Sequence, residues 1–327
     1  MRTVEVVIVG AGMSGLAAAR RLSDAGADVL VLEQQRWVGG RLGTRFVGKA
    51  LVDHGAQFFT VRDPRFANWV DQLIADDLVF EWCLGFGGSD GYPRYAAAGG
   101  MCELARILAR DLAVQLDCPV RSLAADGDAW SISIEGEEPI AASAVILTAP
   151  VPQSLQILRA GGIDLGHEAS EALSGIEYEP TLALVAVLDR PPALPEPGAV
   201  QRDEGSFSFV SDNQAKGLSD VPALTLHATA AMSNSLWNES DSKATANLLN
   251  AAEEFVGDRR VTDIHLTRWR YATPRSVWTD RYHLVADDPG PLLLAGDAFG
   301  GPRVEGAWLS GDASAGLILE RLDPAST

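Results

Sequence analysis

Hydrophobic and polar positions at the start of the chain predict a strand–helix–strand unit. Residues 6–9 and 29–32 are continuous apolar runs, which are typical of strands buried on both faces. Between these runs, apolar side chains from Leu16 to Leu22 recur at helical spacing. We therefore expect residues 4–33 to form a βαβ unit with parallel strands.

The spacing of apolar side chains also predicts helices and strands in the rest of the chain. Helices are expected at residues 63–84, 101–112, 243–256 and 304–322. Short strands are expected at residues 113–117, 120–125, 129–134, 144–147, 181–188, 206–210 and 223–228. The run 144–147 is continuously apolar, so we expect it to be a central strand of the parallel sheet.

The order of these elements predicts an α/β fold with two discontinuous lobes. The first, a Rossmann-like nucleotide lobe, would comprise residues 1–62, 100–154 and 276–327. The second, an inserted α+β lobe for substrate, would comprise residues 63–99 and 155–275.

Composition narrows the possible partners and the compartment. The formal net charge of −18 disfavours nucleic acid and anionic membrane surfaces. The three cysteines show no C-x-x-C spacing, so we expect neither a metal site nor a disulfide framework. No apolar run approaches 18 residues, and Glu5 interrupts the first one, so we expect no membrane span and no export signal. We therefore expect a cytoplasmic protein.

Three glycines directly after the first apolar run carry the first chemical signal. Gly10 allows a sharp turn, Gly12 allows the backbone to approach a pyrophosphate, and Gly15 allows the following helix to pack closely. The helix that begins near Met13 would direct unpaired N–H groups and a partial positive charge at the pyrophosphate. This spacing predicts a dinucleotide site.

Two further segments indicate which dinucleotide is bound. Glu33 closes the second apolar run, 18 residues after Gly15, where an acid can bind the adenosine ribose hydroxyls. Its carboxylate would repel a 2′-phosphate, which disfavours NADP as the resident cofactor. The distant turn Gly296-Asp297, after the apolar run 291–295, favours FAD over NAD.

These segments resemble the flavin amine oxidase superfamily, and within it the bacterial renalase-like oxidases more closely. The superfamily resemblance is carried by residues 10–15, Glu33, residues 39–41 and residues 296–297. The closer resemblance is carried by residues 53–66, 226–229, 268–274 and 301–311.

The resemblance implies a noncovalently bound FAD in the first lobe. Glu33 would hold the ribose, Arg41 would pair with phosphate, and Asp297 would accept a hydrogen bond from a ribityl hydroxyl. The backbone near Val120 would meet adenine, and residues 304–306 would open the last helix beneath the flavin pyrimidine. The implied contacts together are Gly10, Gly12, Met13, Ser14, Gly15, Glu33, Gln34, Gly40, Arg41, Gln57, Val120, Gly296, Asp297, Val304, Glu305, Gly306 and Ala307. Arg36 and Arg45 are alternatives to Arg41 as the arginine that pairs with phosphate.

His227, Tyr271 and Gln57 are the candidate catalytic residues. His227 lies in an apolar run, so it could equally be a core histidine bonded to a backbone carbonyl. His54 is a further candidate, although Gln57 better matches a flavin contact in the family. Trp269 is expected to pack rather than react. The remaining histidines are expected on the surface or in loops, namely His167, His265 and His283.

The lysines bear on the substrate. Amine oxidases of the superfamily typically place a lysine, through water, near flavin N5. Here Lys49 lies early in the chain, and Lys216 and Lys243 lie in polar stretches rather than in a strand that faces a cofactor, which disfavours amine oxidation. The renalase resemblance instead implies hydride transfer from an isomeric dihydro form of NAD(P) to flavin N5, and then transfer to dioxygen to give hydrogen peroxide. Two alternatives remain: a flavin-dependent amine oxidase or desaturase, and a flavoprotein that binds or senses redox state without turnover.

Overall fold

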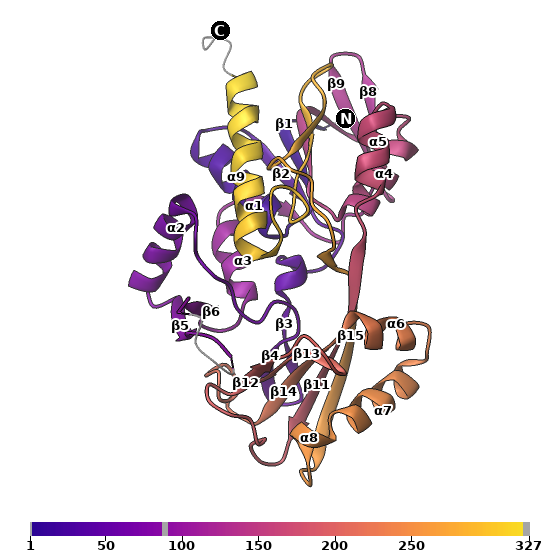
Figure 1. The fold of residues 1–327 in the computed structure, drawn as a ribbon. Helices are drawn as coiled ribbons and strands as arrows, with labels where there is room; N and C mark the ends of the chain where they lie inside the picture. The colour runs from indigo at the N-terminus through magenta and orange to yellow at the C-terminus, as the bar shows by residue number, and fades with distance from the viewer. Residues whose placement is uncertain (1, 87–90, 323–327) are drawn as a thin grey trace. The chain divides into compact units, whose positions relative to one another are not determined.

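The computed structural model describes residues 2–86 and 91–322. These residues divide into two compact units, each discontinuous in sequence (Figure 1). Unit 1 comprises residues 2–40, 104–177 and 274–322. Unit 2 comprises the described residues of 41–103 and residues 178–273.

Within the described residues, unit 1 is built on an eight-stranded sheet. Six strands follow the order β16-β17-β10-β1-β2-β7, and β9 and β8 extend the sheet from β10. The bounds are β1 Arg2–Val9, β2 Val29–Leu32, β7 Ala113–Gln115, β8 Val120–Asp126, β9 Ala129–Ile134, β10 Ile140–Leu147, β16 His283–Ala286 and β17 Leu292–Leu294. The pairs β17–β10, β10–β1, β1–β2 and β2–β7 are parallel. The predicted βαβ unit and the central position of residues 144–147 are confirmed.

The helices of unit 1 have the bounds α1 Met13–Asp24, α4 Val151–Ala160, α5 His167–Ser174 and α9 Arg303–Leu322, and α3 Cys102–Ala109 spans the boundary between the units. Helices α1 and α9 run side by side (Figure 1). They approach so closely that a Cβ on Gly311 of α9 would collide with the carbonyl oxygen of Ser14 in α1. Because only glycine fits this crossing, it fixes the start of α1 against the third turn of α9.

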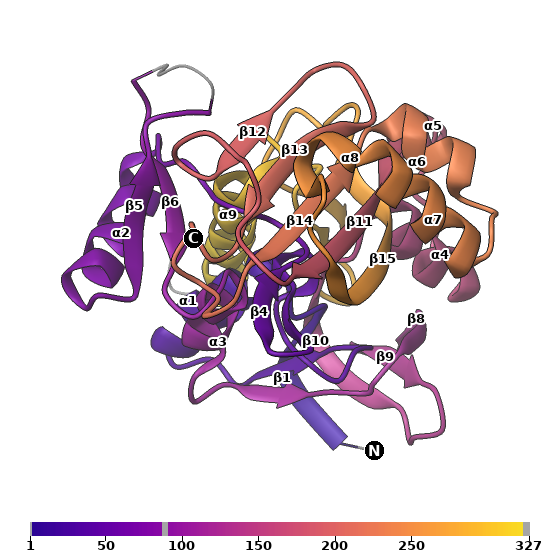
Figure 2. The ribbon, with the colours of Figure 1, turned by 90° about the horizontal axis from the view of Figure 1, so that it is seen from below.

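Unit 2 contains a five-stranded sheet, whose strands follow the order β12-β13-β14-β11-β15 (Figure 2). Their bounds are β11 Tyr178–Leu188, β12 Ala199–Gln201, β13 Phe207–Asp212, β14 Ala223–Ala228 and β15 Val261–Pro274. Two short pairs accompany the sheet: β3 Thr44–Val47 with β4 Ala50–Asp53, and β5 Val79–Cys83 with β6 Arg94–Ala97. The helical segments are η1 Gly40–Leu42, α2 Pro64–Ala75, α6 Ala230–Leu236, α7 Asp241–Ala251 and α8 Glu253–Val256.

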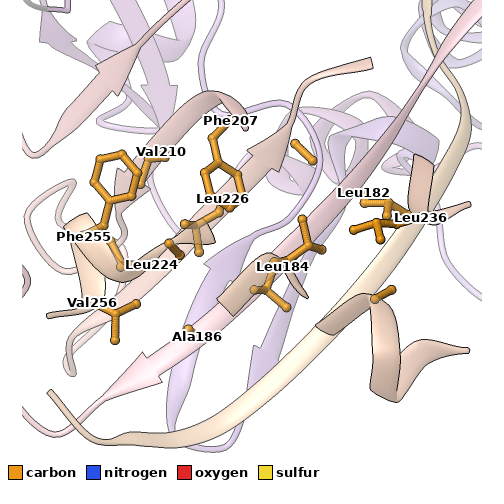
Figure 3. Close-up of a cluster of buried hydrophobic side chains, with 14 of the residues drawn as sticks. Leu182, Leu184, Ala186, Phe207, Val210, Leu224, Leu226, Leu236, Phe255 and Val256 are labelled. Carbon is orange, nitrogen blue, oxygen red and sulfur yellow. The ribbon is translucent and has the colours of Figure 1, made fainter. Parts of the chain in front are cut away.

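Side chains of strand β11 point alternately to the two faces of the sheet of unit 2, so they belong to two different parts of its core. Leu182, Leu184 and Ala186 belong to a cluster that also includes side chains of β13, β14, α6, α7 and α8 (Figure 3). Val185 and Val187, which alternate with them, belong to a second cluster with residues of β3 and β4. The sheet of unit 2 is therefore buried on both faces along β11.

Two helix predictions were wrong in extent. The helix expected at 63–84 is only α2, which ends at Ala75, and residues 79–83 form β5 instead. Asp77, with a φ of 59°, turns the chain after the helix. The aromatic and β-branched residues that follow then favour a strand. The helix expected at 243–256 is split into α7 and α8, and it begins earlier because the Ser240 side chain caps it by accepting from Lys243 N.

The units also depart from the predicted lobe boundaries at two long segments, and by a few residues at 100–103 and 274–275. Residues 41–62 lie in unit 2, because Val52 of β4 packs in one cluster with Val185 of β11. Residues 155–177 lie in unit 1, because α4 packs on β8. At this contact a Cβ on Gly161 would collide with the carbonyl oxygen of Leu123. Which unit serves cofactor and which serves substrate stays a prediction.

Candidate functional site

The carboxyl ends of the parallel strands bring the three sequence signals to one edge of unit 1. Val9 of β1 is in register with Leu32 of β2 and Leu147 of β10, and Leu147 is in register with Leu294 of β17. The residues that follow these strands therefore lie side by side: the glycine turn, Glu33, Thr148 and Ala295. In open α/β sheets this edge is where ligands bind.

The glycine turn combines one open position with two tight ones. Gly10 has a φ of +109° and its Cβ would lie 2.6 Å from Thr148 Oγ1, while a Cβ on Gly15 would collide with the Gly10 carbonyl. Gly12, in contrast, has no heavy atom within 4 Å of where its Cβ would be. The space at Gly12 is therefore left free by the protein, as a close-approaching ligand requires.

The start of α1 has unsatisfied hydrogen-bonding groups. Gly12 is its N-cap residue and supplies no side-chain cap. Ser14 Oγ is buried and has no hydrogen-bond partner among the described residues. A second glycine turn lies beside this helix start, because a Cβ on Gly40 would be 3.8 Å from the Gly12 Cα. A pyrophosphate here would accept from the free N–H groups of the helix and from Ser14.

Glu33 is fixed where it can meet a ribose. Its Oε2 accepts from Ala11 N and its Oε1 from Gln35 N, each at 2.8 Å. Burial raises the pKa of the Glu33 carboxyl, and its backbone hydrogen bonds oppose that rise. Each oxygen keeps a second lone pair for a hydroxyl donor. The main chain of Glu33 also accepts from Cys118 N at 2.8 Å, so the segment leading to Val120 runs beside the acid.

The Gly296-Asp297 turn completes the unit 1 site. Ala295 N donates to Leu147 O at 2.9 Å, and Gly296 N donates to Ser310 Oγ at 2.8 Å. These bonds hold the turn between the end of β10 and α9. Asp297 is buried. These residues fit FAD: the glycine turn and Ser14 would hold its pyrophosphate, Glu33 its ribose and Asp297 its ribityl chain.

The three arginines considered for phosphate differ in their contacts. Arg41 donates to the carbonyl oxygens of Tyr271 and Ala272 at 3.0 and 3.2 Å. Arg36 pairs with Asp117 on the surface, and Arg45 Nη1 lies 2.6 Å from His265 Nε2. Arg41 remains the phosphate candidate because it directly follows the Gly39–Gly40 turn.

In unit 2 a buried polar network surrounds Asp53. Its Oδ2 pairs with Lys216 Nζ at 2.6 Å, and its Oδ1 accepts from Thr44 Oγ1 at 2.5 Å and from Met101 N at 2.8 Å. Lys216 Nζ also donates to the Gln57 carbonyl at 2.6 Å. The sequence placed Lys216 in a polar stretch, but its side chain is only 1% exposed because Asp53 compensates its charge.

Gln57 takes part in the same network through its side-chain amide. Its Nε2 donates to the carbonyls of Asp53 and Gly55 at 2.6 and 3.0 Å, and its Oε1 accepts from Ser211 Oγ at 2.8 Å. Both amide protons are therefore in use. A role for Gln57 in catalysis would have to come from its position or its remaining lone pair.

His227 lies beside Phe209, one of four aromatic side chains of unit 2 that contact one another and that we call the aromatic cluster: Phe58, Trp82, Phe86 and Phe209. Neighbouring ring centroids in the cluster are 5.0–6.4 Å apart, and the Phe209 and His227 rings are 6.4 Å apart. His227 Nε2 is buried and has no hydrogen-bond partner in the described part of the chain.

Two histidines of unit 2 are held neutral. Burial, with a smaller contribution from Lys216, lowers the pKa of His227 to about 4, while a hydrogen bond with the His54 backbone opposes this. Burial, and next the charge of Arg45, lowers the pKa of His54 to about 3. The His54 ring stacks on Trp269 at 5.3 Å, and Trp269 Nε1 donates to the His54 carbonyl at 2.8 Å.

Tyr271 meets Tyr178 edge to face at 5.5 Å, so adjacent strands β15 and β11 present an aromatic pair. Two other histidines do not lie where the sequence predicted them, on the surface or in loops. His265 lies in β15 and His283 in β16, and burial lowers the pKa of each, so neither is a simple surface or loop residue. His167 is exposed, as expected.

The open glycine turn, the buried acid Glu33 at the end of β2 and the Gly-Asp turn define a class of protein, the dinucleotide-binding flavoproteins with a Rossmann-type unit. Residues 8–73 match the family described as NAD(P)-binding Rossmann-like domain, and residues 80–319 match the family described as Flavin containing amine oxidoreductase. The chain belongs to the flavin containing amine oxidoreductase family, whose cofactor is FAD.

Similar proteins match over short segments of sequence and over the whole fold. Putrescine oxidase of Kocuria rosea is 42% identical over 69 residues, which are 21% of this chain and 14% of that protein. Polyamine oxidase 1 of Zea mays is 42% identical over 67 residues, which are 20% of this chain and 11% of that protein. A structure of putrescine oxidase bound to putrescine has a TM-score of 0.75 at 18% identity, covering 98% of this chain and 99% of that one. These matches support the fold, and the predicted superfamily is confirmed.

Two parts of the site were not predicted from the sequence. Thr148 Oγ1 donates to the carbonyls of Val9 and Gly10 at 2.9 and 3.2 Å. Its place directly after a predicted central strand was a signal that could have identified it. The Asp53–Lys216 pair joins positions 163 residues apart, and nothing in the local sequence links them.

Among the described residues, no helix is both long and apolar enough to cross a membrane. No group of three or more His, Cys, Asp or Glu residues in this part of the chain is placed to hold a metal ion.

Proposed function

We propose that this protein oxidises a reduced nicotinamide, in its isomeric 2- or 6-dihydro forms, with dioxygen as acceptor. FAD, when bound, would take two electrons and a proton from a ring carbon as hydride and return them to dioxygen, which with one further proton from solvent gives hydrogen peroxide. The product ring is aromatic, so the reaction has its own driving force and needs little acid–base catalysis. Orientation by the protein would then carry most of the rate.

The observation that carries this proposal is the state of His227. Its Nε2 is buried without a partner, while the His54 backbone hydrogen-bonds the ring. With Nδ1 as the donor in that bond, Nε2 is a free acceptor in a neutral ring. A carboxamide N–H of a nicotinamide would satisfy it. The neighbouring aromatic cluster suits the flat ring of the same group.

The environment of His227 also bears on amine oxidation, the second candidate. That candidate has the support of the family match and of the likeness to putrescine oxidase. A site that lowers the pKa of two histidines opposes positive charge, however, and a polyamine carries more than one such charge near neutral pH. The three lysines also have other surroundings than the lysine that amine oxidases place near flavin N5: Lys49 is exposed, Lys216 pairs with Asp53, and Lys243 pairs with Glu239.

Anaerobic mixing of the FAD-loaded protein with a panel of reductants tests the proposal. The panel contains NADH, its 2- and 6-dihydro isomers, putrescine and a primary monoamine. We expect rapid flavin bleaching by one of the isomers, slow bleaching by NADH and none by the amines. Admission of dioxygen should restore the oxidised spectrum and release hydrogen peroxide. Fast bleaching by an amine, with both isomers inert, would assign the protein to amine oxidation. Binding of FAD without reduction by any member would indicate a flavoprotein without turnover.

A further inference from the structure

Lys216 is a buried cation that no step of the proposed reaction uses. Its Nζ lies 2.6 Å from Asp53 Oδ2, 2.6 Å from the Gln57 carbonyl and 5.3 Å from the centre of the Trp82 ring. The ammonium group therefore bridges the polar network and the aromatic cluster. A buried ion pair is weak evidence for stability, because desolvation offsets much of the attraction. We therefore looked for a functional role of the Lys216–Asp53 pair.

The charge of the pair is distributed unequally. Asp53 Oδ1 is covered by the Thr44 hydroxyl and Met101 N–H, which disperse the negative charge on that side. The ammonium places two donors on Asp53 and Gln57, and Trp82 lies within cation–π distance. The His227 ring experiences this positive charge, which contributes to its lowered pKa.

The aromatic cluster already holds two cations of the protein itself. Lys216 lies over Trp82, and the Arg94 guanidinium lies 5.7 Å from the centre of the Phe58 ring. Aromatic faces attract one cation each, and a further cation brought among them would meet two like charges. In a partly desolvated site this repulsion is felt over several ångströms.

We propose that Lys216, held by Asp53 and Gln57 against Trp82, is a specificity-determining residue that makes the aromatic cluster prefer an uncharged ring over a cationic one. This inference rests on the proposed function, because it takes the cluster as the place of the nicotinamide ring. Hydride loss converts a neutral dihydropyridine into a pyridinium cation. The same charge would thus admit the reduced substrate, reject protonated amines and favour release of the oxidised product.

The preference can be measured without turnover, using two probes that differ in charge. Nicotinamide is neutral, and 1-methylnicotinamide carries the same ring as a cation. In ligand-observed NMR titrations of the FAD-loaded protein, we expect nicotinamide to bind about tenfold more tightly, the ratio expected for like charges about 12 Å apart at an effective dielectric of about 20. Equal binding of the two probes, tighter binding of the cation, or no binding of either would overturn the proposal.

Variants assign the preference to Lys216. Lys216→Met alone would leave a buried unpaired carboxylate and could unfold the protein, so the test uses D53N/K216M, in which both charges are removed. The matched control is E239Q/K243M, which removes an exposed Lys–Glu pair. We expect the binding ratio to fall to about one in D53N/K216M and to stay about tenfold in the control. An unchanged ratio in D53N/K216M would refute the assignment.

A second variant, D53N/K216Q, keeps an amide donor at position 216. Its ratio of nicotinamide binding to 1-methylnicotinamide binding is expected to fall to about one, as in D53N/K216M.

The proposed function and the role of Lys216 can be rejected separately. Inert dihydronicotinamide isomers in the bleaching assay would reject the proposed function even if the charge preference holds. An absent preference would reject the role of Lys216 even if the isomers reduce the flavin.

Discussion

The backbone N–H of Ala11 donates a 2.8 Å hydrogen bond to Oε2 of Glu33, so the glycine turn and the acid that ends β2 are joined directly. One carboxylate thereby holds the shape of the turn, and under the predicted cofactor assignment its remaining lone pairs would meet a ribose. Loss of this side chain should affect the cofactor in two ways, through the lost ribose bonds and through a looser turn.

We predict that Glu33→Ala weakens FAD binding at least about tenfold, the usual effect of losing hydrogen bonds to a charged group. Titration of the apoprotein with FAD, followed by flavin fluorescence, measures the change. Glu5→Ala is the matched control, because Glu5 Oε2 also accepts a backbone N–H, that of Asp28, away from the turn. Equal affinities of E33A, E5A and the unaltered protein would contradict the assignment of Glu33 to ribose.

Substitutions at Gly12 and Gly15 should have different effects, the first on FAD binding and the second on the stability of the fold. Gly12→Ala places a methyl group in open space at an ordinary backbone conformation, whereas Gly15→Ala drives one into the Gly10 carbonyl. We expect G12A to keep the stability of the apoprotein within about 1 kcal/mol while losing most FAD affinity. We expect G15A to lower the free energy of unfolding by about 3 kcal/mol. Urea unfolding of both apoproteins, with FAD titration, distinguishes these outcomes, and tight FAD binding by G12A would count against the pyrophosphate assignment.

Stability should depend on pH through His54 and His227. Both have folded pKa values, about 3 and about 4, that lie below the ordinary value of 6.5. The unfolded chain therefore binds protons that the folded chain refuses, and stability falls as pH drops below about 6.5. Each histidine should contribute a slope approaching about 1.4 kcal/mol per pH unit between pH 6 and 5.

Urea unfolding at a series of pH values measures this slope. We expect His54→Asn to remove about half of the part due to the two histidines. His167→Asn, at an exposed position, should leave the slope unchanged. A slope in H54N equal to that of the unaltered protein would show that His54 is not kept neutral by the fold.

The parts of the site that depend on local sequence could be predicted, because the required geometry is itself local. A sharp turn at Gly10 and a tight helix contact at Gly15 each demand glycine, and Gly12 between them leaves the backbone open to a ligand. Glu33 follows from the same logic, since parallel strands bring their carboxyl ends together. Gly296-Asp297 was located by the apolar run 291–295 before it, which the structure shows to contain the buried strand β17.

The parts that depend on tertiary pairing could not be predicted. Lys216 sits among polar neighbours in sequence, and only the fold brings Asp53 within reach to compensate its burial. The end of helix α2 at Ala75 was not predicted for a related reason. The apolar side chains of residues 79–83 continue the helical pattern in the sequence, and only their pairing with β6 makes these residues a strand.

His227 and Tyr271 lie in two strands of one sheet, β14 and β15. We expect His227→Ala and Tyr271→Phe to slow flavin reduction by the preferred dihydronicotinamide isomer about tenfold or more while leaving FAD content unchanged. The reason for His227 is the loss of the acceptor Nε2, and for Tyr271 the loss of the hydroxyl from the ring that meets Tyr178 edge to face. His283→Ala is the control for a half-buried histidine of unit 1, and Tyr178→Phe is the control for the aromatic pair. Stopped-flow reduction under anaerobic conditions separates rate from cofactor content. Unchanged rates in both H227A and Y271F would assign the two side chains to packing and would require another source of orientation for the substrate.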